Sequence, residues 1–256
     1  VAYAEEVGGV KLEERISQLP LVKRLVKELS LELRTATPKA KRKAWPILSC
    51  FVAALENTVM NEDATVYLRL LAWCKLLRIW GSLRSADTAG IPAMSLDYKE
   101  GAVTGKIVIS KTTGAGKNVG VTYFTVSSEA WLHRPAWLLE GWLLYEEARG
   151  DWPCLLTLPT KTETLSDQPP TYVQNCVASR KLLSDLTVLE GQPQAGTMIL
   201  APGVQTYWSE HSDRATLTTW ASWLDIDKSQ RDMLGRWNVS GSDEYIRNQM
   251  ATCRRI

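Results

Sequence analysis

Histidine is scarce in this chain, and its cysteines do not pair by spacing. The 256 residues include two histidines and five cysteines, an odd number, and no two cysteines form a Cys-x-x-Cys motif. Zinc sites need clustered cysteine and histidine ligands, and disulfide frameworks need an even set of cysteines. We therefore expect no structural metal, no disulfide framework and a reducing compartment.

Long hydrophobic runs are also missing. No stretch approaches the ~20 consecutive apolar residues that cross a bilayer, so we expect no membrane partner. The first residues, Val1 to Glu6, lack the basic start of a secretory signal and include no initiator methionine, so we expect a fragment or a processed chain. Hydrophobic residues still make up 45% of the sequence, which is enough for the core of a soluble globular protein.

The overall charge does not point to a polyanionic partner, because 30 basic and 28 acidic side chains leave a formal net charge of only +2. Basic residues do cluster locally, at Lys39, Lys41, Arg42 and Lys43. Such a run can cross the backbone of DNA, and it is equally compatible with a solvated linker. A nuclear import signal is a weaker interpretation of the same residues.

The spacing of apolar residues predicts a mostly helical chain. Helical periodicity recurs at residues 11–34, 45–60, 64–79, 170–191 and from 214 onward. Alternating or β-branched residues predict short strands at 94–98, 104–110 and 118–126, with a glycine-rich hairpin turn at 112–116. Residues 131–158 are rich in tryptophan and leucine, which favours a helical core layer over a base-stacking platform.

Two arginines are candidates for binding a phosphate, because planar guanidinium groups neutralise the non-bridging oxygens of a phosphodiester without a metal ion. Arg84 follows a predicted helix, and Asp87, three residues later, could hold its guanidinium in one orientation. An arginine near a helix end is otherwise more often a solvated or capping residue. Arg214 is the second candidate.

His211 precedes Arg214 by three residues at a predicted helix start, so we expect both on one outward face, where they can contact one phosphate. The inward face of this helix is formed by Leu217, Trp220 and Leu224. Trp237 offers an indole N–H, a donor that suits a phosphate oxygen. A lone histidine or tryptophan is more often structural, so the phosphate-binding interpretation depends on His211, Arg214 and Trp237 occurring together.

Tyr245 is the candidate nucleophile. A free phenol, with a pKa of about 10, is a poor nucleophile and needs neighbouring cations or a base, which the arginines and His211 can supply. Tyr172 and Tyr207 are competing tyrosines, but both precede the Gly-x-Trp step that ends at Trp237.

Lys111 is the candidate general acid for the leaving 5′ oxygen, because it stands at the entrance of the predicted hairpin turn. Lys117, at the other end of the turn, is the alternative, and either lysine could instead be a solvated hairpin residue. A phosphate-binding loop is excluded, because Lys111 and Asn118 occupy the positions at which a Walker motif needs glycine and Ser or Thr.

The candidate set resembles the catalytic residues of the tyrosine recombinases, the Cre and lambda-integrase family. Six positions occur in the family's order: Arg84, Lys111, His211, Arg214, Trp237 and Tyr245. The family accepts His or Trp at the position of Trp237. Its arginine motif is Gly-Leu-Arg-x-x-Glu, from which this chain departs by having Ser82 between Gly81 and Leu83 and Asp87 in place of glutamate.

The resemblance implies a mainly α fold with a small three-stranded antiparallel sheet, the tyrosine recombinase catalytic domain, over residues 44–256. Residues 1–43 would be the C-terminal remnant of an N-terminal DNA-binding domain plus a basic linker. The implied function is that of a site-specific recombinase or integrase, which cleaves and rejoins DNA through a covalent 3′-phosphotyrosyl intermediate, without metal, ATP or other cofactor. Its partner would be double-stranded DNA, held by a homotetramer in a synaptic complex.

The closing Ser-Asp-Glu-Tyr-Ile-Arg sequence is similar to recombinases of eukaryotic mobile elements, which would place the protein in the nucleus, and otherwise in the cytoplasm or nucleoid. Two alternative functions remain open. A type IB topoisomerase shares the chemistry but relaxes supercoils as a monomer. A mobile-element-derived DNA-binding protein with a decayed catalytic site is the other, and the departures at Ser82 and Asp87 leave room for it.

Overall fold

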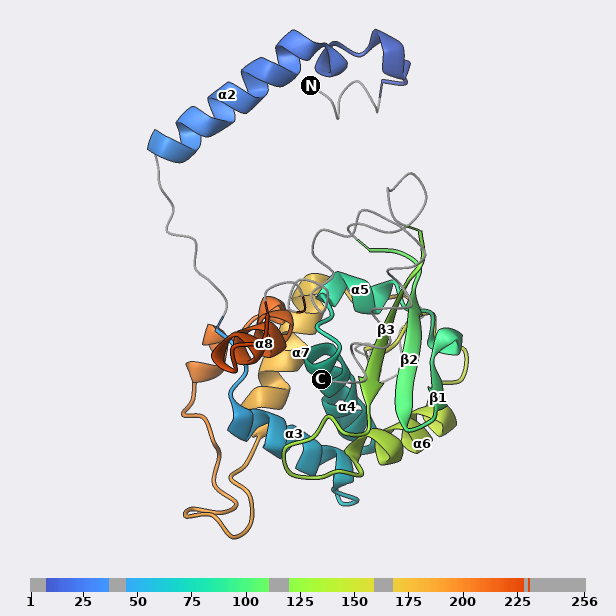
Figure 1. Ribbon diagram of the computed structural model, residues 1–256, viewed down its shortest axis with the longest axis vertical. Helices are drawn as coiled ribbons and strands as arrows, with labels where there is room; N and C mark the ends of the chain where they lie inside the picture. The colour runs from blue at the N-terminus through green and yellow to red at the C-terminus, as the bar shows by residue number, and fades with distance from the viewer. Residues whose placement is uncertain (1–7, 37–44, 111–119, 159–167, 228–229, 231–256) are drawn as a thin grey trace. The chain divides into compact units, whose positions relative to one another are not determined.

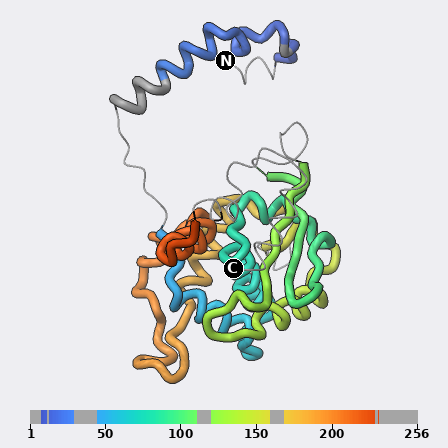
Figure 2. Tube along the Cα trace, viewed as in Figure 1, coloured from blue at the N-terminus to red at the C-terminus, as the bar shows by residue number. Residues whose placement is uncertain are grey.

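The computed structural model describes residues 8–36, 45–110, 120–158, 168–227 and 230, which are coloured by residue number in Figure 1. The chain divides into two compact units, Val1–Lys43 and Ala44–Ile256. Figure 2 follows the same trace as a tube. No helix among the described residues is both long and apolar enough to cross a membrane.

The first unit contains one long helix. Two short 3-10 helices, Leu12–Glu14 (η1) and Ile16–Gln18 (η2), precede α2 (Pro20–Ala36). The predicted helical segment 11–34 is therefore divided at Pro20, which has no N–H to donate and is tolerated in the first turn of a helix. Apolar side chains along α2 are exposed, among them Leu21, Leu25 and Leu29.

The second unit is built mainly from helices. Their bounds are α3 (Ser49–Met60), α4 (Val66–Trp80), α5 (Ser85–Ala89), α6 (Trp137–Ala148), α7 (Tyr172–Asp185) and α8 (Glu210–Trp223), with short 3-10 helices η3 (Ala93–Ser95) and η4 (Val204–Tyr207). Hydroxyl side chains of Thr65, Thr171 and Ser209 accept backbone N–H bonds in the first turns of α4, α7 and α8. These caps satisfy donors that a helix start leaves unpaired, so they fix where the three helices begin.

The sheet of the second unit has three antiparallel strands in the order β1-β2-β3. The strands are β1 (Asp97–Lys99), β2 (Ala102–Ile107) and β3 (Thr122–Ser127), and Val103 lies opposite Val126 (Figure 1). The strand predicted from Met94 was wrong at its start, because Ser95 donates its hydroxyl to the carbonyl of Pro92 and the chain forms η3 there. The predicted fold class, mainly α with a small antiparallel sheet, is confirmed.

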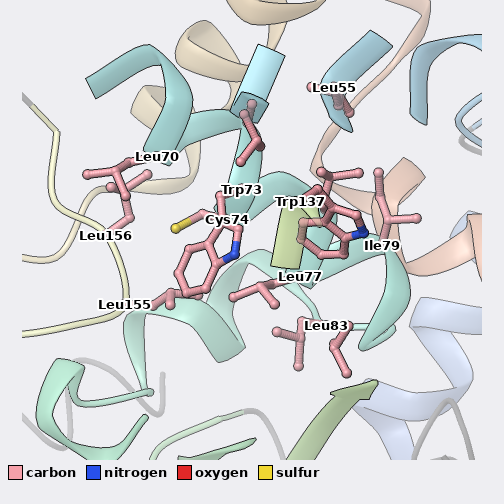
Figure 3. Close-up of a cluster of buried hydrophobic side chains, with 14 of the residues drawn as sticks. Leu55, Leu70, Trp73, Cys74, Leu77, Ile79, Leu83, Trp137, Leu155 and Leu156 are labelled. Atoms are coloured by element: carbon pink, nitrogen blue, oxygen red, sulfur yellow. The ribbon is translucent and has the colours of Figure 1, made fainter. Parts of the chain in front are cut away.

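The core of the second unit surrounds α4, which packs against α3, α6, α7 and α8. Trp73 of α4 and Trp137 of α6 are fully buried, and Figure 3 shows both among the leucine side chains of this core. The indole of Trp73 also donates to the carbonyl of Leu138, at 3.2 Å. The tryptophan-rich segment 131–158 thus supplies a core helix, as predicted, although Trp131 itself is 44% exposed.

Gly141 lets α6 approach α4 closely, because a Cβ at this position would lie 2.0 Å from Cδ1 of Trp73. Gly141→Ala should therefore lower the free energy of unfolding by about 2 kcal/mol, since overpacking outweighs the gain of about 1 kcal/mol in helix propensity. Chemical denaturation measures the change. The matched control is Gly120→Ala, whose Cβ would meet no atom within 4 Å. An equal loss in both variants would contradict the packing explanation.

Candidate active site

Arg84 begins α5 at a corner of the chain that follows α4. The end of α4 at Trp80 is followed by a short turn, in which Leu83 is fully buried and anchors the corner in the core. Arg84 is half-buried, and within the described part of the chain no acceptor bonds its guanidinium. A cation held on a rigid corner in this way can bind an anion without first breaking an ion pair.

Ser82, in the same corner, is bound on both sides to Arg214 of α8. Its hydroxyl donates to the carbonyl of Arg214 at 3.3 Å, and its own carbonyl accepts from Nη1 of Arg214 at 3.2 Å. Ser82 also adopts a left-handed conformation, with φ of 48°, whereas Gly81 has φ of −82°. The left-handed position of the turn is therefore Ser82, at a conformational cost of about 1–2 kcal/mol that the two hydrogen bonds offset.

Asp87 connects the two arginine-bearing segments, but not in the way predicted. Its Oδ2 accepts the backbone N–H of Arg84 at 2.9 Å and lies 4.0 Å from Nη1 of Arg214. The prediction that Asp87 holds the Arg84 guanidinium was wrong, because a carboxylate in the first turn of a helix reaches back to the N-cap backbone. Asp87 instead brings the start of α5 and the guanidinium of Arg214 to one oxygen atom.

The first turn of α8 presents His211 outward and Arg214 inward. His211 is exposed, and its ring centroid lies 6.0 Å from that of Tyr172 on α7. Arg214 is only 7% exposed, so the prediction that it shares an outward face with His211 was wrong. The corner formed by Ser82 and Asp87 covers it. Leu217 is buried as predicted.

The C-terminal end of α8 differs from the prediction in one residue. Leu224 is 75% exposed rather than inward-facing, because α8 ends at Trp223 and Asp225 turns the chain with a positive φ of 53°. Trp220, by contrast, packs edge-on against Trp80, with ring centroids 6.0 Å apart. The inward face of α8 is therefore shorter than its sequence periodicity indicates.

Four charged side chains that the sequence analysis missed lie buried between α4 and α8. Nζ of Lys75 contacts Oδ1 of Asp213 at 2.8 Å, and Nη2 of Arg78 contacts carboxylate oxygens of both Glu210 and Asp213. The exposed fraction of each residue is 6% or less. Their signal in the sequence was the interruption of an otherwise apolar helix by Lys75 and Arg78, since charges in such a place usually have buried partners.

A hydroxyl from α7 joins this group. Ser179 accepts a hydrogen bond from Nζ of Lys75 at 3.3 Å and also hydrogen-bonds Glu210. Burial alone would lower the pKa of Arg78, but Asp213 and Glu210 raise it above its ordinary value. Arg78 is therefore a buried cation held between two acidic side chains, and we call Lys75, Arg78, Ser179, Glu210 and Asp213 the buried ion network.

The competing tyrosine Tyr172 is 47% exposed and lies at the start of α7. Burial is the main reason that its pKa is raised above the ordinary value. A nucleophilic phenol needs its pKa lowered, because attack on phosphorus requires the phenolate.

Part of the predicted site lies outside the described residues: Lys39, Lys41, Arg42, Lys43, Lys111, Lys117, Trp237 and Tyr245. Their roles stay predictions. Among the described members, the structure joins Arg84, Asp87 and Arg214 in one cluster and places His211 one turn before Arg214 on α8. The arrangement offers one half-buried cation, one buried cation and an exposed imidazole for an anionic substrate.

Comparison with known proteins gives no family model that matches and no curated protein that matches. The similar solved structures are tyrosine recombinases and integrases. The post-cleavage complex of the XerH site-specific recombinase with palindromic difH substrate is 12% identical, with a TM-score of 0.49 over 86% of this chain and 53% of that one. This chain therefore spans about half the length of XerH.

Two further structures of the same kind are similar. The Tn1549 transposon integrase in complex with transposon right end DNA is 11% identical, with a TM-score of 0.49 over 98% of this chain and 82% of that one. The FLP recombinase–Holliday junction complex is 13% identical, with a TM-score of 0.45 over 89% of this chain and 53% of that one.

Substitutions of Ser82 test whether its left-handed backbone is strained. Ser82→Ala should lower the free energy of unfolding by about 1 kcal/mol, because it loses the hydroxyl bond and keeps the conformational cost. Ser82→Gly loses the same bond but relieves about 1 kcal/mol of strain, so its stability should stay close to that of the wild type. Urea denaturation measures both variants, and equal stability of the alanine and glycine variants would argue against strain.

The charge of Glu210 should make the protein sensitive to acid. Burial opposes the ionised carboxylate, but Arg78 and Lys75 outweigh it and hold the pKa of Glu210 below its ordinary value of 4.5. A carboxyl group with a lower pKa in the folded state adds stability above its unfolded pKa and loses it as the pH falls. Below about pH 4.5, the free energy of unfolding should decline more steeply in wild type than in Glu210→Gln. Urea denaturation across pH measures both slopes, which would coincide if Glu210 were not responsible.

Proposed function

We propose that this protein cleaves and rejoins DNA through a covalent bond between Tyr245 and a 3′ phosphate. The observation that carries the proposal is that one oxygen of Asp87 accepts the backbone N–H of Arg84 and faces the guanidinium of Arg214, one helical turn from the exposed His211. Two arginines on segments joined in this way suit the non-bridging oxygens of one phosphodiester. Tyr245, the last of the candidate residues along the chain, is the proposed nucleophile.

The proposed reaction exchanges one phosphodiester bond for another. The phenol of Tyr245 gives its proton to His211, and its oxygen forms a bond to phosphorus while the bond from phosphorus to the 5′ oxygen breaks. Lys111 gives the leaving oxygen a proton. The two arginines neutralise the charge of the transition state, and His211 and Trp237 donate hydrogen bonds to the phosphate. Attack by the 5′ hydroxyl of another strand reverses the step, so the reaction needs no ATP.

Recombination between two DNA duplexes is the proposed outcome of this chemistry. It requires four active sites, which a homotetramer on two duplexes would provide. The basic run that ends at Lys43 would contact the DNA backbone. The same proposal implies a location in the nucleus or the nucleoid, because a recombinase acts where its DNA is.

Covalent trapping of DNA tests the proposal. Wild-type protein, incubated without metal or nucleotide with a pool of nicked duplexes, should form an SDS-resistant adduct that Tyr245→Phe does not form, because phenylalanine lacks the attacking oxygen. Arg84→Lys should form the adduct roughly 100-fold more slowly, because an ammonium group cannot replace the planar fork. Gel electrophoresis after SDS denaturation measures both effects.

Three outcomes separate the alternatives. An adduct that survives Tyr245→Phe would overturn the assignment of the nucleophile. Relaxation of supercoiled DNA by the monomer, with no requirement for a particular site, would favour a type IB topoisomerase. Tight DNA binding with no adduct on any substrate, unchanged by Tyr245→Phe, would instead identify a DNA-binding protein with a decayed site.

A further inference from the structure

The buried ion network joins the two segments that carry the candidate arginines. Lys75 and Arg78 belong to α4, which leads directly into the corner with Arg84. Glu210 and Asp213 belong to the first turn of α8, where Asp213 immediately precedes Arg214. The network therefore connects the helix that leads to Arg84 with the helix that carries Arg214.

Stability alone is a weak explanation for this arrangement. Removing charges from water is costly, and apolar side chains of similar size often stabilise a protein equally well in the same place. Leu76 and Leu77, which lie between Lys75 and Arg78 in the sequence of α4, are fully buried. Stability alone therefore does not require charged side chains between α4 and α8.

Directional contacts provide something that apolar packing does not. Apolar surfaces can slide or rotate against each other with little change in contact, whereas a hydrogen-bonded ion pair is strong only at one distance and orientation. Nη2 of Arg78 contacts two carboxylates that lie three residues apart on α8, so rotation or translation of α8 would break at least one contact. Ser179 adds a third direction from α7.

We infer that Lys75, Arg78, Glu210 and Asp213 are positioning residues, which fix the first turn of α8 so that Arg214 and His211 face the same phosphate as Arg84. This role rests on the proposed function, since it concerns the geometry of that site. None of the four touches the substrate. They act through the backbone of α8, and displacement of that turn would misplace Arg214 and His211 together.

The test separates positioning from stability by removing a whole ion pair. The double substitution Lys75→Met with Asp213→Val keeps the net charge and leaves Arg78 paired with Glu210. Its cleavage rate at saturating nicked DNA should fall roughly 100-fold, because small displacements of catalytic groups have effects of this size. The Kd for DNA and the thermal midpoint should stay near their wild-type values, since no residue of the network is exposed to DNA.

A matched control removes an ion pair of the same composition elsewhere. Lys181 and Asp185 form an i,i+4 pair at 2.9 Å on α7, with side chains 74% and 33% exposed. Lys181→Met with Asp185→Val changes the same charges, and its cleavage rate should equal that of the wild type. A second variant, Arg78→Lys, keeps the charge but loses the guanidinium that contacts both carboxylates, and it should also cleave slowly while binding DNA normally.

The outcomes distinguish this inference from the proposed function. A folded double variant that cleaves at the wild-type rate overturns the positioning role, and Arg78→Lys decides by the same comparison if the double variant does not fold. Failure of both variants to fold assigns the network to stability and also overturns the inference. Wild-type protein that forms no adduct on any nicked duplex overturns the proposed function, and the positioning role with it.

Discussion

The first turn of α8 is held against the corner between α4 and α5, and the arrangement of the candidate site depends on this contact. Arg214 makes it from both its backbone and its side chain, since its carbonyl accepts from Ser82 while its guanidinium donates to the carbonyl of Ser82 and faces Asp87. The direction of the guanidinium is thus set by protein groups before any substrate arrives. Such preorganisation is the main way in which proteins stabilise a developing charge.

Helix α4 is buried on nearly every side, because it packs against four other helices. A charged residue can be accommodated in such a place only with a partner of opposite charge. Lys75 and Arg78 meet this condition because Glu210 and Asp213 are equally buried. Loss of one member would leave an uncompensated charge in the core, at a cost of about 3–5 kcal/mol. The helix therefore tolerates paired changes better than single ones.

Local patterns in the sequence predicted the elements well, because helix periodicity, strand alternation and glycine-rich turns are short-range signals. The position of Arg84 shortly after α4 could be predicted for this reason. The burial of Arg214 could not, because it depends on Ser82 and Asp87, which are more than a hundred residues away in the chain. The partner of Asp87 was predicted wrongly for a different, local reason, because the backbone N–H of Arg84 at the start of α5 binds the carboxylate in place of the guanidinium.

Burial also makes these charges respond differently to salt. Ions in solution screen exposed charges strongly and buried pairs weakly. The binding of a protein to DNA, by contrast, weakens steeply as salt is added, because salt reduces the free energy gained when counterions are released from the DNA. Lys75, Arg78, Glu210 and Asp213 are all buried, so added salt would leave their contacts nearly unchanged. Under the proposed function, ionic strength would thus control whether DNA is bound, while the arrangement of Arg84 and Arg214 would be the same in dilute and in concentrated salt.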